Sequence, residues 1–180
     1  TCALPIYEGD IDYFTPGEGG GIKAGGTVIV RRSTIARNVG AGIVHAGGTL
    51  LVENSTIVSN TAAPWVFPYD PFKLRGIRGA GIYSEGDLTV KNSTIVSNLC
   101  NGPSFVAGDK AGGIFSTNSF TLQNTVVAFN YADTYGDITS ANVVGSLKGS
   151  NNFITGDPAL GPLRDNGGPT FTMLPMFGSP

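Results

Sequence analysis

The amino-acid sequence predicts an all-β solenoid, a single domain in which short strands stack coil upon coil. A unit that opens with Gly-Ile and closes with Asn occurs four times, at residues 21–38, 42–60, 81–98 and 113–130. Within each unit apolar residues alternate at a period of two, which is the period of a β-strand. The closing asparagines lie 22, 38 and 32 positions apart, so a constant unit is joined by connections of variable length.

Each unit contains three short strands, and their inward residues follow from the alternation. We expect these inward positions to be Ile22, Ile43, Ile82 and Ile114 in the first strand, Val28/Val30, Leu50/Val52, Leu88/Val90 and Phe120/Leu122 in the second, and Ile35, Ile57, Ile95 and Val127 in the third. A triangular coil of this size cannot bury its own inward face. Stacking the coils ~4.8 Å apart joins like residues into a continuous core.

Asparagines recur at two corners of the predicted coil. They are Asn54, Asn92 and Asn124 before the third strand, and Asn38, Asn60, Asn98 and Asn130 after it. Asparagine tolerates the left-handed backbone of tight turns, and stacked amides can hydrogen-bond along a stack. Two of them also begin the glycosylation sequons Asn54-Ser55-Thr56 and Asn92-Ser93-Thr94. Asn124 occupies the same position without a sequon, so we interpret the asparagines as structural corner residues.

The longer connections follow the third strand and form insertions at one corner, at residues 61–80 and 99–112. The first insertion carries Trp65, Phe67 and Tyr69, which either stack on a flat ligand such as a sugar ring or pack on the coil wall. A polar cluster on the two insertions is a candidate for catalysis; its members are Asp70, Arg75, Asp109 and Lys110. Connections on one face of a solenoid are frequent sites of function.

The two ends of the chain depart from the repeat. Residues 1–19 match no unit, and their acidic stretch lacks the D-x-[DN]-x-[DN]-G pattern of a calcium loop, so we predict no metal or other cofactor. The coils are expected to occupy residues 20–155. In the fifth coil we expect Asp137-Ile138-Thr139 to open the first strand, with Val144, Leu147 and Ile154 inside. Residues 156–180 are rich in turn dipeptides.

Composition limits the classes of partner. The net charge is −2 and only 13% of residues are charged, which argues against a nucleic-acid partner. No apolar run approaches the ~18 residues of a membrane-spanning helix. Cys2 and Cys100 are either two unrelated thiols or a disulfide that ties the N-terminal segment to the third connection.

The GGI and LTV-NSTI-SN motifs resemble the right-handed parallel β-helices of the pectate-lyase-like superfamily. The tail, DPALGPLRDNGGPT followed by MFGSP, is similar to the segment that ends the repeats in bacterial surface proteins of the choice-of-anchor Q type. The resemblance implies a right-handed parallel β-helix of about five coils. It also implies an extracellular or bacterial cell-surface location, in a group whose function is mostly unassigned.

Pectate lyases of this fold bind calcium through acidic residues on the outward face of the first strands. The equivalent column here contains Lys23, Val44, Tyr83 and Phe115, with no acid. The coil acids Glu53, Glu85 and Asp87 do not pair at matching positions, as the carboxylates of a glycoside hydrolase must. The only histidine, His45, takes a corner position that serine or alanine holds in the other coils. We therefore assign no catalytic residues and favour a non-enzymatic protein, with the question of enzymatic activity left open.

The outward face of the third strands is flat and uncharged; its members include Thr34, Thr56, Val58, Thr94 and Val96. Such a face is usually covered, here by the tail, by another chain, or by ordered water as in ice-binding solenoids. The open ends of a β-solenoid also require cover, which terminal segments or a neighbouring molecule would supply.

We therefore expect a structural or adhesive protein that self-associates into fibres through its termini. The alternatives are a carbohydrate-active module that contacts polysaccharide through Trp65, Phe67, Tyr69, Tyr83 and Phe115, and an ice-binding protein.

Overall fold

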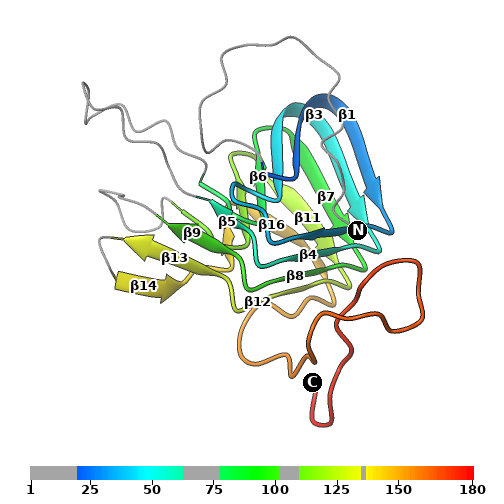
Figure 1. Ribbon diagram of the computed structural model, residues 1–180. Coiled ribbons are helices and arrows are strands. Elements are labelled where there is room, and N and C mark those ends of the chain that lie inside the picture. Colours follow the sequence, from blue (N-terminus) through cyan, green and yellow to red (C-terminus); the bar gives the residue numbers. More distant parts are fainter. Residues whose placement is uncertain (1–19, 63–77, 102–109, 135–136) are drawn as a thin grey trace.

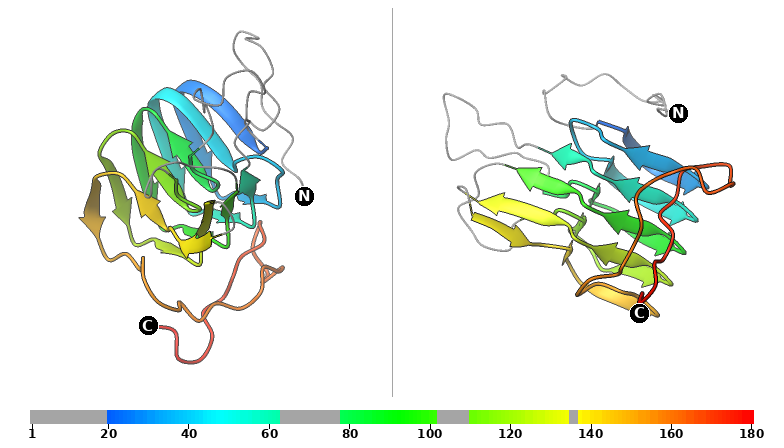
Figure 2. Two further views of the ribbon diagram at one scale, coloured as in Figure 1. Left: turned by 90° about the vertical axis from the view of Figure 1, so that its left-hand side faces the viewer. Right: turned by 60° about the horizontal axis from the view of Figure 1, so that its bottom comes forward.

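The structure, a computed structural model, describes residues 20–62, 78–101, 110–134 and 137–180. Every regular element in these residues is a β-strand, and the strands form three sheets that run along one stack (Figure 1). All strand pairs are parallel except one, the pair at the edge of the third sheet. The predicted all-β coil stack is confirmed, and the side view shows its rungs lying one above another (Figure 2).

The main sheet has eight strands, contributed by the first two strands of each unit. In order across the sheet they are β15 (Val143–Val144), β10 (Ile114–Ser116), β6 (Ile82–Ser84), β3 (Ile43–Glu53), β7 (Asp87–Lys91), β11 (Phe120–Gln123) and β16 (Leu147–Ser150), with β1 (Ile22–Arg31) paired to β3. In β1 and β3 the two predicted strands are one continuous strand. Gly26, Gly47 and Gly48 bend these strands at positive φ angles of 78°, 111° and 90°, which glycine adopts without steric cost.

The third strands of the units form a second sheet, and a third sheet lies at the corner of the insertions. The second sheet contains β2 (Thr34–Ala36), β4 (Thr56–Val58), β8 (Thr94–Val96) and β12 (Val126–Ala128). The third, which we call the flanking sheet, contains β5 (Thr61–Ala62), β9 (Leu99–Asn101), β13 (Tyr131–Thr134) and β14 (Asp137–Ser140). The predicted triangle of three strands per unit is therefore wrong in detail. The first two strands share one sheet. The third sheet combines β5 and β9, from residues assigned to the insertions, with β13 and β14, from the stretch expected to begin the fifth coil.

The interior of the stack is the apolar core that the alternation predicts. Ile35 pairs with Ile57, Ile57 with Ile95, and Ile95 with Val127, so identical or similar side chains lie directly above one another. Every inward residue predicted for the four units either belongs to this core or packs against it. In the fifth coil Val143, not Val144, faces the core, together with Leu147 and Ile154.

The start of the fifth coil is a further correction. Residues 137–139 do not open a parallel coil, because β14 turns back and pairs antiparallel with β13. Ile138 is consequently 63% exposed. The fifth coil begins instead at β15, which pairs with β10 through Val143 and Ile114. The position of Val143 follows from this later start.

A ladder of asparagine side chains runs along the corner after the second sheet. Each Nδ2 donates to the Oδ1 of the asparagine in the next coil, at 2.7 Å from Asn38 to Asn60, 2.9 Å from Asn60 to Asn98 and 2.9 Å from Asn98 to Asn130. Asn130 continues it to Asn142 at 3.1 Å, a member that the repeat did not predict. Asn60, Asn98 and Asn130 are fully buried, so these bonds satisfy amides that are shielded from water.

The asparagines at the other corner are exposed, and they adopt the backbone conformation that the turn requires. Asn54, Asn92 and Asn124 adopt positive φ angles of 50°, 47° and 50°, the left-handed conformation that asparagine tolerates best among residues with a side chain. The Nδ2 of Asn124 donates to the Oδ1 of Asn92 at 3.0 Å. These angles place the three residues at turns, where the repeat pattern predicts corner residues.

The C-terminal segment packs on the outer face of the second sheet. Val58, Val96 and Ala128 form a buried apolar cluster with Phe153 of the fifth coil and with three tail residues, Leu160, Leu163 and Met173. The hydroxyl of Thr34 donates to the carbonyl of Phe171 at 2.8 Å. The sequence left three possible covers for this outward face: the tail, another chain or ordered water. The tail lies against it in the structure, and Figure 2 shows the tail running beside the strands in orange and red. The face comprises Thr34, Thr56, Val58, Thr94 and Val96. The face is therefore not an open array for ordered water.

Replacing Ile57 by aspartate should unfold the protein. Ile57 is fully buried in the isoleucine column, and an unpaired carboxylate there costs at least about 3 kcal/mol. Ile29→Asp is the matched control, because Ile29 lies on the outer side of β1 and is 55% exposed. Thermal unfolding followed by circular dichroism measures the difference, and equal melting temperatures for the two variants would contradict the assigned core.

Replacing Asn98 by alanine should destabilise the stack by roughly 3 kcal/mol or more. The side chain accepts from Asn60 and donates to Asn130 and to the carbonyls of Ile57 and Val96, and each buried partner left unpaired costs ~1–3 kcal/mol. Asn92→Gly at the exposed corner keeps the left-handed backbone and should change stability by less than about 1 kcal/mol. Urea unfolding compares the two, and a similar effect of both substitutions would show that the buried ladder has no special role.

Candidate functional site

The outward face of the first strands carries an aromatic column at its centre. The register places Lys23, Val44, Tyr83 and Phe115 side by side on consecutive rungs, as the sequence predicts. Val144, which was expected inside the core, extends the column by one rung. The rings of Tyr83 and Phe115 stack with their centroids 5.8 Å apart and their planes 17° from parallel. Tyr83 is partly exposed, whereas Phe115 is only 8% exposed. The accessible aromatic surface of this column is therefore mainly that of Tyr83.

Two charged residues border the aromatic pair. The guanidinium carbon of Arg78 lies 5.7 Å from the centroid of the Phe115 ring, within the range of a cation–π contact. The hydroxyl of Tyr83 donates to a carboxylate oxygen of Glu85 at 2.5 Å. Arg78 and Glu85 are both exposed. An exposed cation, an exposed carboxylate and a half-buried aromatic ring thus share one face, which we call the Tyr83 face. Arg78 lies at the end of an insertion, and the repeat pattern did not single it out.

The flanking sheet packs against one edge of the Tyr83 face. Ala62 of β5 and Cys100 of β9 form a buried cluster with Val44, Ala41 and Ala80, and Tyr83 packs against this cluster. Burial raises the pKa of the Cys100 thiol to about 11, and the nearby Lys110 ammonium opposes part of this shift. The group is thus a thiol and not a nucleophilic thiolate at neutral pH. Burial likewise lowers the pKa of Lys110, whose ammonium donates to the carbonyl of Asp133. Both side chains hold the flanking sheet in place.

Several predicted residues lie outside the described structure. They are Trp65, Phe67, Tyr69, Asp70, Arg75 and Asp109 of the insertions and Cys2 of the N-terminal segment. The expected glycan platform, the polar cluster and the pairing of Cys2 with Cys100 therefore stay predictions. Glycosylation of the two sequons is likewise untested. Tyr83, Phe115 and Lys110 are described, and the structure brings the first two together.

Two of the described acids are engaged by different neighbours. Glu53 pairs with Arg31 at 2.9 Å on the outer side of the main sheet, and Glu85 accepts from Tyr83. Among the residues that the structure describes, no group of three histidine, cysteine or acidic side chains is arranged to hold a metal ion. This part of the chain also has no helix long and apolar enough to cross a membrane.

His45 occupies the predicted corner and joins three coils. It is fully buried, with Nδ1 3.0 Å from the hydroxyl of Ser84 in the next coil and Nε2 3.2 Å from the carbonyl of Gly26 in the coil before. The carbonyl of Gly26 can only accept, so Nε2 donates to it, and Nδ1 is in hydrogen-bond contact with the Ser84 hydroxyl. With both ring nitrogens engaged in the wall of the stack, His45 has a structural role.

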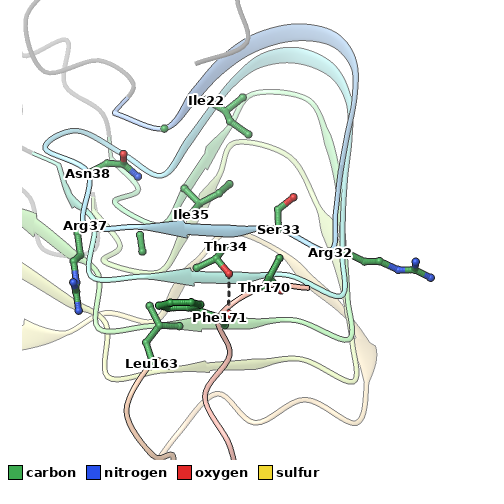
Figure 3. Close-up of a pocket in the computed structure, with 12 residues that line it drawn as sticks. Ile22, Arg32, Ser33, Thr34, Ile35, Arg37, Asn38, Leu163, Thr170 and Phe171 are labelled. Atoms are coloured by element: carbon green, nitrogen blue, oxygen red, sulfur yellow. Dashed lines mark hydrogen bonds between the residues drawn. The ribbon is translucent and has the colours of Figure 1, made fainter. Parts of the chain in front are cut away.

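A concave surface lies at the end of the stack that begins with β1 and β2. A pocket of about 570 Å³ is bounded by β2, by the residues that flank it and by the tail residues Leu163, Thr170 and Phe171 (Figure 3). Arg32 and Arg37 lie at opposite ends of β2, and Ile22 and Ile35 line the pocket on the core side. The sequence did not predict this pocket, because it depends on the position of the tail.

Comparison with known proteins bears on the fold alone. A family model described as a right-handed β-helix region matches residues 11–142. No match was found among the curated proteins or among the solved structures that were searched. The family match agrees with the parallel sheets and the stacked core described above. The chain therefore belongs to the right-handed β-helix family.

Proposed function

We propose that the protein is a non-enzymatic structural or adhesive component of the bacterial exterior, related to the choice-of-anchor Q surface proteins. The observation that carries this proposal is the continuous stacking of the coils, which are joined through the buried asparagine ladder. Glu53 pairs with Arg31 and Glu85 accepts from Tyr83 on a different rung, so each of these two carboxylates is engaged by its own neighbour. Hydrolysis of glycosidic bonds requires two carboxylates within about 10 Å on either side of the bond.

The construction of the coils supports a mechanical role. The buried asparagine ladder and the backbone ladder both run along the stack, so each coil bonds the next through side chains as well as through the main chain. The tail adds apolar contacts across several rungs of the second sheet. Such a stack resists unravelling because opening one coil breaks both ladders at once and exposes buried amides.

The absence of catalysis can be tested on acidic and neutral polysaccharides, with and without calcium. We expect no release of unsaturated or reducing ends above the background of a heat-unfolded sample. Steady turnover that Glu85→Gln or Asp87→Asn abolishes would contradict the proposal, because these are exposed acids near the Tyr83 face.

A second candidate function is polysaccharide binding at the Tyr83 face. The stacked pair Tyr83–Phe115 favours it, because a partly exposed aromatic ring beside hydrogen-bonding charges suits the apolar face and the hydroxyls of a sugar. Binding without turnover is also what an adhesive protein requires.

Tyr83→Ala should weaken carbohydrate binding by about tenfold, the loss expected from removing one ring contact of ~1.4 kcal/mol. The matched control is Tyr131→Ala, because Tyr131 is also partly exposed, at 37%, but lies on the flanking sheet. A glycan array followed by calorimetry on the best ligand measures both variants. Binding that is equally sensitive to both substitutions, or to neither, would remove the Tyr83 face as the site.

A further inference from the structure

The first coil differs from the other coils at both corners of its third strand. It has a cation at each of them, Arg32 before the strand and Arg37 after it. The residues at the same positions of the next three coils are uncharged; they are Asn54, Asn92 and Asn124 at the first corner and Ser59, Ser97 and Phe129 at the second. All of these residues have φ angles between 47° and 57°. Arginine is not among the residues that favour this left-handed conformation, so the turn itself does not account for the two cations.

The guanidinium groups at these corners are exposed. Arg31 pairs with Glu53 at 2.9 Å, whereas neither Arg32 nor Arg37 has an ion pair with any residue that the structure describes. Residues 20–41 contain four cations, which are Lys23, Arg31, Arg32 and Arg37, and no acid. The described surface at this end of the stack is therefore positive, which favours an anionic ligand.

The pocket beside β2 lies between the two corners. One wall is β2, and the other is the tail, which the Thr34 hydroxyl holds through its hydrogen bond to the Phe171 carbonyl at 2.8 Å. Figure 3 shows the side chain of Arg37 on the same side of β2 as Phe171 and Leu163, and Arg32 projecting at the opposite end. Phe171 is 47% exposed. The pocket thus offers an accessible aromatic ring and a cation on one side of the strand.

These features suit an acidic sugar. An exposed aromatic ring accommodates the apolar face of a sugar ring, and a guanidinium binds the oxygens of a carboxylate or a sulfate through charge-assisted hydrogen bonds. Arg32 and Arg37 are five residues apart, roughly 16 Å along an extended strand. One ligand therefore reaches both only if it is a polymer with repeated acidic groups. An acidic peptide has such groups as well, but the exposed ring of Phe171 favours a ligand with flat apolar faces.

We propose that the pocket beside β2 binds acidic polysaccharide. Phe171 stacks on one sugar ring, Arg37 pairs with an acidic group next to that ring, and Arg32 pairs with a second acidic group farther along the polymer. The pocket and the Tyr83 face lie on different sides of the coil, so this site does not depend on carbohydrate binding at the Tyr83 face.

Calorimetry of the full 180-residue protein with three dextrans tests the requirement for charge. Neutral dextran, carboxymethyl dextran and dextran sulfate share one backbone and differ in the acidic group. At least one charged dextran should bind about tenfold or more tightly than neutral dextran, and the tighter of the two identifies the preferred group as carboxylate or sulfate. Polyglutamate of similar length should bind about tenfold or more weakly than that dextran.

Substitutions locate the site on the protein. Arg32→Gln/Arg37→Gln should weaken binding of the preferred dextran by about tenfold or more, because it removes both charged contacts. Phe171→Leu should weaken binding by about fivefold, because it removes the ring but keeps an apolar side chain and the carbonyl that accepts from Thr34. Lys91→Gln/Lys148→Gln is the matched control, because it removes two cations from β7 and β16 of the main sheet and should change the affinity by less than about twofold. Tyr83→Ala should leave this binding unchanged, and a loss of binding in that variant would instead assign it to the Tyr83 face.

Four further results would overturn the proposal. One is charged dextrans that bind no more tightly than neutral dextran. Another is an equal loss of affinity in the two double variants, because binding would then follow net charge alone. The third is binding that Phe171→Leu leaves unchanged. The fourth is polyglutamate that binds as tightly as the charged dextrans, because the ligand would then be an acidic peptide.

Discussion

The structure depends on one constraint, which is that every coil must repeat the hydrogen-bonding pattern of its neighbour in register. A coil of three short strands cannot satisfy its own backbone groups, so its N–H and C=O groups bond to the rungs on either side. The buried asparagines follow from the same constraint. At the corner where the strand ends, the Oδ1 of each asparagine accepts both the backbone amide and the Nδ2 of the preceding asparagine. The side chain thus replaces the strand hydrogen bonds that the turn removes.

Different segments of the chain cover different parts of the outer surface. The tail occupies the second sheet, the flanking sheet borders the first strands, and the long outer side of the main sheet carries paired charges such as Arg31 and Glu53. Exposed ion pairs of this kind add little stability, but alternating sign across rungs disfavours a slipped register. The Tyr83 face and the pocket beside β2 both remain accessible, and they lie on different sides of the coil.

The core was predictable from the sequence because inward positions alternate at a fixed period and recur at equivalent places in each unit. Ile57 and Leu122 needed no tertiary information. The flanking sheet was not predictable, because Thr61–Ala62 and Leu99–Asn101 are too short to show alternation and precede segments that look like loops. Val143 and Asn142 were missed because β14 folds back and delays the fifth coil. The contacts of Leu160 and Leu163 depend on where a turn-rich tail lies, which local pattern does not specify.

The candidate site was less predictable than the core for a related physical reason. Inward residues are constrained by the same neighbours on every rung, so repetition reveals them. Outward residues meet different surroundings on each rung, and Val44, Tyr83 and Phe115 share a column without sharing a role. Val44 is covered by the flanking sheet, Phe115 lies under Arg78, and Tyr83 alone keeps accessible ring surface. In a solenoid the information about function therefore lies in departures from the repeat, and these departures acquire meaning only when the covering segments are placed in space.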